Sequence, residues 1–153
     1  MPSIHAFDDP SAARDWLTSA PRAPLSRIHE LVMHARESER AEAGLSSAAD
    51  WLVTRAAAHV ALARRGSRVA LYDLRESFDA AAVPLPVDFL VAAGLVGDET
   101  CLEPLARAWA AAPNEAWWRD RLRDAAADIV KREKLTGRSG AVRRIREKWT
   151  GFL

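Results

Sequence analysis

The sequence predicts an all-α protein built from successive antiparallel helix pairs. Alanine makes up roughly a fifth of the chain, and alanine has the strongest intrinsic preference for helix. Glycine, proline and short polar residues cut the chain into pieces of helical length. No segment alternates apolar and polar residues with the two-residue period of a strand, so no β-structure is expected.

The expected helix ends follow from residues that begin or stop helices. Asp9 before Pro10 is typical of an N-cap followed by proline at the first helical position. Asp98 and Asn114 are expected to cap two later helices, and Gly66 is expected to end an earlier one. In chain order, the expected helices cover about 10–19, 25–43, 47–65, 67–80, 86–94, 98–113, 114–135 and 141–150.

Apolar residues recur at i, i+3, i+4 and i+7 in several of these helices, which places them on one face of a helix. A helix pair that recurs every 30 to 45 residues or so is typical of an α-solenoid, in which each pair buries its apolar face against the next. The recurring stripes begin at Ile28, Leu71, Leu102 and Val142, and the stripes of the intervening helices begin at Trp51, Phe89 and Trp118.

The third pair, residues 97–134, resembles a HEAT-like repeat. Pro104 stands where that family often has a helix-bending proline, and Asn114 stands in the turn before the second helix. Arg119, followed by small apolar residues, matches an arginine of the family's second helix. The pair at 67–96 departs, because Asp73 replaces the proline and its second helix is short. The pair at 25–65 shares only the apolar stripe with the HEAT-like pattern.

This resemblance covers about residues 25–134. It implies three HEAT-like pairs at 25–135, preceded by an N-terminal segment with a short helix at 1–24 and followed by a basic capping helix at 136–153. HEAT-like families mostly imply scaffolding and protein binding. Some members imply nucleic-acid binding, and others act on phycobilin attachment.

The composition excludes several classes of protein. Hydrophobic residues are 49% and charged residues 28%, which excludes wholesale disorder, and a net charge of +1 gives no overall attraction to anionic polymers. The single cysteine, Cys101, excludes an internal disulfide framework. The first residues lack the basic and apolar regions of a secretory signal, and the longest apolar runs are too short to cross a membrane. A cytoplasmic protein is expected.

The chemistry-bearing residues form no recognisable catalytic or metal-binding motif. His29 and His34 are five residues apart, about 140° around a helix, whereas a helical zinc site needs histidines four apart. His59 lies on the apolar face of its helix, where a hydrogen-bonded core histidine is expected. Cys101 has no histidine near it in sequence and is expected to be a packed thiol. We therefore expect no catalytic residue, no metal and no cofactor.

Two features are candidates for contact with a partner. Residues 130–149 carry eight basic side chains and two acidic ones. This segment fits either a solvated cap at the end of a solenoid or a surface for phosphates, anionic lipid or an acidic protein. Trp117 and Trp118 are adjacent and cannot both face the same core direction. One of them either covers a neighbouring repeat or is exposed as an anchor for a partner, and Trp117 is the candidate anchor. The candidate anion or partner contacts are Arg138, Arg143, Arg144, Arg146 and Lys148.

These observations predict a non-enzymatic HEAT-like module that acts as a scaffold for another protein. The alternative is a HEAT-like module that binds nucleic acid through its basic C-terminal helix. A third hypothesis, an enzyme, needs a pocket that joins Cys101, His59 or carboxylates, and the sequence alone shows no such pocket.

Overall fold

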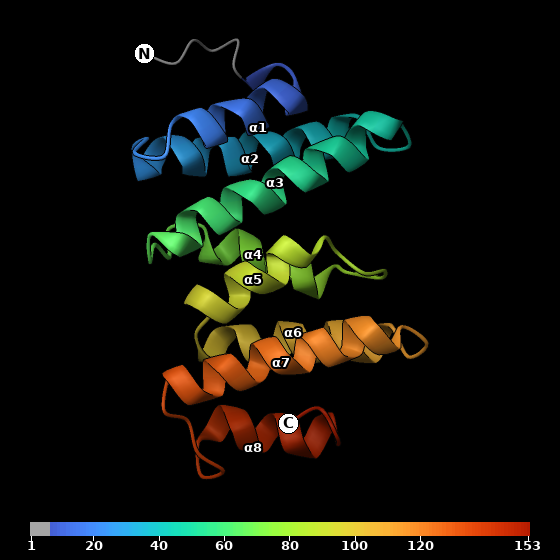
Figure 1. The fold of residues 1–153 in the computed structure, drawn as a ribbon. Helices are drawn as coiled ribbons and strands as arrows, with labels where there is room; N and C mark the ends of the chain where they lie inside the picture. The colour runs from blue at the N-terminus through green and yellow to red at the C-terminus, as the bar shows by residue number, and fades with distance from the viewer. Residues whose placement is uncertain (1–6) are drawn as a thin grey trace. The chain divides into compact units, whose positions relative to one another are not determined.

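The computed structural model describes residues 7–153, and all regular structure in that range is helical (Figure 1). The predicted all-α class is therefore confirmed. No helix in residues 7–153 combines the length and the apolar character that a membrane crossing requires. The helices are α1 (Pro10–Ser19), α2 (Leu25–Ala41), α3 (Ser46–Arg64), α4 (Leu71–Asp79), α5 (Val87–Val96), the 3-10 turn η2 (Glu99–Cys101), α6 (Leu102–Ala111), α7 (Ala116–Arg132) and α8 (Gly140–Lys148).

The chain divides into two compact units between Ala70 and Leu71. The first unit contains α1, α2 and α3, and the second contains α4 to α8. The division falls inside the segment 25–135 that the sequence assigns to the repeats.

In the first unit, α3 packs along α2 and also against α1. As predicted, Asp9 caps α1: its carboxylate accepts a hydrogen bond from the backbone N–H of Ala12, and Pro10 occupies the first helical position. The predicted stripe of α2 is buried and joins one apolar core, in which the edge of the Phe7 ring meets Trp16 at a centroid distance of 5.2 Å. This core includes Ala13, Ile28, Leu31, Val32, Ala35, Trp51, Ala58 and Leu62.

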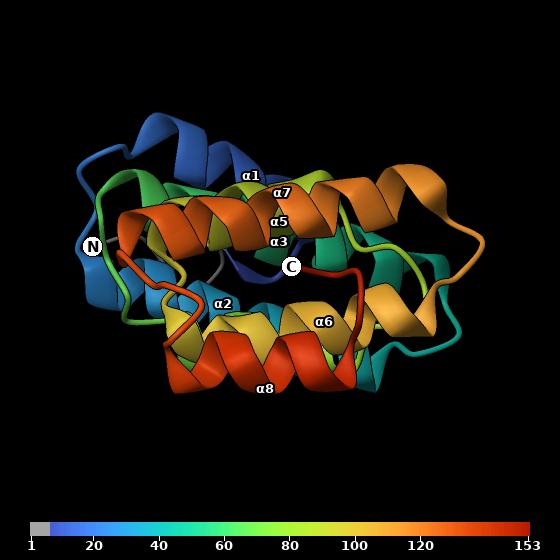
Figure 2. The ribbon, with the colours of Figure 1, turned by 90° about the horizontal axis from the view of Figure 1, so that it is seen from below.

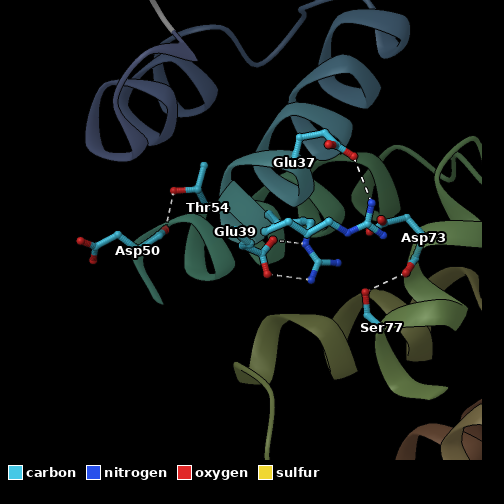
Figure 3. Close-up of polar contacts among 8 residues, drawn as sticks. Glu37, Glu39, Asp50, Thr54, Asp73 and Ser77 are labelled. Atoms are coloured by element: carbon cyan, nitrogen blue, oxygen red, sulfur yellow. Dashed lines mark hydrogen bonds and ion pairs between the residues drawn. The ribbon is translucent and has the colours of Figure 1, made fainter. Parts of the chain in front are cut away.

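Polar side chains also link the helices of the first unit. Glu39 of α2 accepts two hydrogen bonds from Arg55 of α3, at 2.5 Å from Nε and 3.1 Å from Nη2 (Figure 3). Thr54 donates to the carbonyl of Asp50 in its own helix and accepts from Arg14 of α1 at 3.0 Å. A paired guanidinium and carboxylate hold the register of α2 on α3, because only one alignment lets both bonds form.

In the second unit, successive helices alternate between two layers. One layer contains α4, α6 and α8, with α6 packed against both of the others. The other layer contains α5 and α7, which pack along each other, and α6 also packs on α7 across the layers. Figure 2 shows α6 and α8 together on one side of this unit and α7 with α5 on the other.

The centre of the second unit combines aromatic rings with the predicted stripes. The Phe78 ring lies 6.4 Å from both Phe89, edge to face, and Trp118, stacked. These rings come from α4, α5 and α7, so they join the two layers. The aliphatic residues of this centre are all buried, namely Leu102, Leu105, Leu122, Ala126 and Ile129. Each such side chain contributes about 1.5 to 3 kcal/mol before the loss of conformational entropy is subtracted.

Some helix ends differ from the prediction. The fourth helix begins at Leu71 and not at Ser67, because the Ser67 hydroxyl accepts a hydrogen bond from the backbone N–H of Val69 and holds a turn there. Asn114 caps no helix: the residue at the N-cap of α7 is Glu115, without a side-chain bond to the helix. Asp98 caps as predicted, because its carboxylate accepts from the Thr100 N–H at 2.9 Å.

Candidate interaction surfaces

The basic C-terminal segment forms an amphipathic helix. In α8, Val142 and Ile145 are buried, and α8 packs on α6. The basic candidates lie on the other faces of α8 or in the loop before it. All five are exposed, and none of them forms an ion pair with an acidic side chain in residues 7–153, namely Arg138, Arg143, Arg144, Arg146 and Lys148.

These five side chains do not gather at one place. Arg146 lines a groove beside α7, together with Lys131 and Lys134. Arg144 and Lys148 line a separate pocket of about 660 Å³, which also contains the carboxylates of Glu99, Glu103 and Glu147. The Lys148 amine lies over the Trp149 ring, 4.8 Å from its centroid. The acidic neighbours of Arg144 and Lys148 oppose the binding of an anion there.

The groove beside α7 is lined by both apolar and charged side chains. It measures about 950 Å³ and lies between α7, α8, the loop that joins them and the last residues of the chain. The C-terminal residues return from α8 toward α7 (Figure 2), where the Phe152 carbonyl accepts a hydrogen bond from Arg123 Nε at 3.3 Å. The apolar lining consists of Ala127, Val130, Leu135, Val142, Phe152 and Leu153, and the charged lining consists of Asp120, Arg123, Asp124, Lys131, Lys134 and Arg146.

Arg132 belongs to the same basic segment, but its side chain binds backbone carbonyls of the same chain. Its guanidinium donates hydrogen bonds to the carbonyls of Gly94 and Gly97 at the end of α5. These carbonyls have no helical partner, so the arginine satisfies the C-terminal end of α5. Nothing in the sequence pattern indicates this role, because Arg132 is 38 and 35 residues from the two carbonyls that it binds.

Trp117 and Trp118 diverge as the sequence predicted. Trp118 is 1% exposed and lies in the core, whereas Trp117 is 50% exposed. The two rings meet edge to face with a centroid distance of 6.0 Å. A large aromatic side chain that is half exposed beside a rigid core is a suitable anchor for a protein partner, because little of its freedom is lost on binding.

Cys101 is packed in the core and is poorly suited to nucleophilic chemistry. It is 1% exposed. Burial raises the pKa of its thiol from an ordinary value of 9.0 to about 11, and a backbone hydrogen bond with Asp98 offsets only part of this effect. Since the thiolate is the reactive form, the thiol is protonated and inert near neutral pH.

The histidines occupy separate environments. His34 packs edge to face on Trp51, with a centroid distance of 5.2 Å, and its ring lies 6.1 Å from Phe7. His59 is 3% exposed, and His29 is partly buried. Within residues 7–153, no three histidine, cysteine or acidic side chains are placed so that they could hold a metal ion together.

The chain matches no protein-family model, no curated protein and no solved structure.

Proposed function

We propose that this chain is a HEAT-like α-solenoid module whose function is to bind another protein, without a catalytic reaction of its own. The observation that carries the proposal is the alternation of layers in the second unit. There α4 and α5 form one pair, α6 and α7 form the next, and α8 continues the first layer. A second helix for α8 would lie beside α7. The groove beside α7 therefore occupies a position where a solenoid accepts a further helix.

Two further observations support a protein as the partner. The groove offers apolar side chains together with both signs of charge, and this combination suits a folded or helical protein segment. Trp117, on the same helix, adds an exposed aromatic anchor.

The experiment is affinity capture from a native lysate, with and without nuclease, followed by titration of the recovered protein against the purified chain. We expect a partner that resists nuclease and that loses about tenfold or more in affinity when Trp117 is replaced by alanine, as truncation of an interface anchor does. The matched control is Tyr72→Ala, which removes another exposed aromatic side chain, 65% exposed, from α4. Equal losses in both variants, or no partner that survives purification, would contradict the proposal.

The second candidate function is the binding of nucleic acid. It is favoured by the five exposed basic side chains, none of which forms an ion pair with an acidic side chain within residues 7–153. Its test is the titration of duplex DNA against salt for the native chain and for a variant in which Arg138, Arg143 and Arg144 are glutamine. Phosphate contacts predict weaker binding at higher salt and a smaller salt dependence in the variant. The carboxylates beside Arg144, Lys148 and Arg146 oppose this function, so we place it second.

A further inference from the structure

One face of α7 has a charge pattern that is complementary to itself. At 100° per residue, Asp120, Asp124, Ala127 and Lys131 fall within about 60° of arc on this helix. The structure places the same four residues along the groove, and Lys134, just past the helix end, lines it as well. This stripe lies roughly opposite the buried stripe of α7 and carries acid at one end and base at the other.

Ala127 lies at the centre of this pattern. Asp120 is seven residues before it and Lys134 is seven residues after it, while Asp124 is three before and Lys131 four after. Ala127 is exposed and small, so a second helix can approach closely at this point. If that helix is another α7 that runs antiparallel, each aspartate faces a lysine of the other copy.

We infer that the face of α7 centred on Ala127 binds a second copy of this chain in a two-fold, antiparallel arrangement. The inference rests on the proposed function and deepens it by naming one partner. Asp120 would face Lys134 of the other copy, and Asp124 would face Lys131. A two-fold axis repeats each contact, as it does in most homodimers.

Neighbouring residues of the groove add to the fit. Arg146 strengthens the basic end: its Nη1 lies 2.9 Å from the position that a Cβ on Gly137 would take, so the guanidinium lies over the loop between α7 and α8. Val130, which is partly buried, supplies apolar surface beside the central alanine. The contact is small and its ion pairs are exposed to solvent, so we expect a weak dimer that depends on salt.

The pattern favours a second copy over nucleic acid as the occupant. The carboxylates of Asp120 and Asp124 lie in the same groove as the lysines, and they would repel a phosphate chain that follows it. A partner with only acidic side chains would likewise meet repulsion at one end. A second α7 offers a lysine to each aspartate, while Arg123, which lies between the two aspartates in sequence, donates its Nε hydrogen bond to the Phe152 carbonyl.

The test uses two charge-reversed variants of the full chain and sedimentation measurements over a range of concentrations and salt. One variant carries Asp120→Lys and Asp124→Lys, and the other carries Lys131→Asp and Lys134→Asp. We expect each variant alone to dimerise about tenfold or more weakly than the native chain, since like charges then face each other. An equimolar mixture of the two variants should regain association as a heterodimer, because opposite charges face each other again.

A matched control for the variant with Lys131→Asp and Lys134→Asp is Arg22→Asp with Arg64→Asp, which makes the same change in charge at exposed positions of the first unit. This control should dimerise as the native chain does, and circular dichroism of every variant verifies folding. A native chain that stays monomeric up to about 1 mM, the weak end of measured association, would overturn the inference. So would native association that both variants retain, or a mixture that fails to associate.

These outcomes are distinct from those for the proposed function. A monomeric chain that still binds another protein through Trp117 would leave the proposed function standing and remove only the second copy as a partner. If the groove instead binds duplex DNA and the chain stays monomeric, the inference also fails.

Discussion

The guanidinium of Arg119 lies 3.7 Å from the centroid of the Trp109 ring and also donates a hydrogen bond to the Trp109 carbonyl. Arg119 comes from the first turn of α7, and Trp109 comes from the last turn of α6. The Arg119 side chain therefore stabilises the connection between α6 and α7 in two ways. It makes a cation–π contact, and it donates a hydrogen bond to a carbonyl in the last turn of α6.

Replacement of Arg119 by methionine should lower the free energy of unfolding by about 2 kcal/mol, because the cation–π contact and a charged hydrogen bond are both lost. Urea unfolding, followed by tryptophan fluorescence, measures this change. Arg121→Met is the control, since Arg121 is an exposed arginine of the same helix. If both variants unfold at the same urea concentration, the contact does not stabilise the connection between α6 and α7.

Leu105 should be among the most sensitive positions of the second unit. It is fully buried in α6, and Leu105→Ala should cost about 2 to 5 kcal/mol through lost burial and the cavity left behind. Leu105→Asp should unfold the chain cooperatively, as an unpaired carboxylate has no place in that core. The control is Leu95→Ala, where 47% of the residue is already exposed. An unchanged thermal melt for Leu105→Asp would refute the packing.

Gly97 should resist substitution by alanine. A Cβ there would lie 2.5 Å from the Ala93 carbonyl oxygen and 2.7 Å from Cδ1 of Ile129, so α5 and α7 would have to move apart. We expect a loss of about 1 to 3 kcal/mol, the usual cost of overpacking, measured by thermal unfolding. At Gly94 the Cβ would meet only the flexible end of Asp128, at 3.2 Å, so Gly94→Ala is the milder control.

The stability of the chain should fall in strong alkali because of Cys101. The folded state holds the thiol proton more tightly, with a pKa of about 11, than the unfolded state, with a pKa near 9.0. The resulting stabilisation is complete below pH 9 and is lost as the pH rises through 11, with a total of about 2 to 3 kcal/mol. Denaturant unfolding between pH 8 and pH 11 tests this, with Cys101→Ala as the reference that lacks the component. Equal pH dependence in both chains would contradict it.

The sequence predicted the buried faces of helices well where the spacing of apolar residues along the helix determines them. The i, i+3, i+4 pattern from Ile28 and from Leu102 placed buried residues correctly, since helical periodicity alone decides which side faces inward. The start expected at Ser67 was wrong, because a serine that can cap a helix can equally hold a turn. Local chemistry does not decide between the two.

Features that depend on distant residues were not predictable. Trp109 continues the stripe from Leu102 but is only partly buried. Its ring contacts Arg119 and lies 5.7 Å from the Phe152 ring near the end of the chain, and neither contact follows from the stripe. The groove beside α7 likewise depends on the return of Phe152 from α8. The pattern of the basic segment could not show that Arg132 is used internally while Arg146 lines the groove.

The two hydrogen bonds from the Arg132 guanidinium to the carbonyls of Gly94 and Gly97 join the last turn of α7 to the C-terminal end of α5. Separating them would leave two carbonyls and a guanidinium without their bonds at the same moment, so these turns should open in a single event. Their backbone amides should consequently exchange hydrogen for deuterium at one common opening free energy.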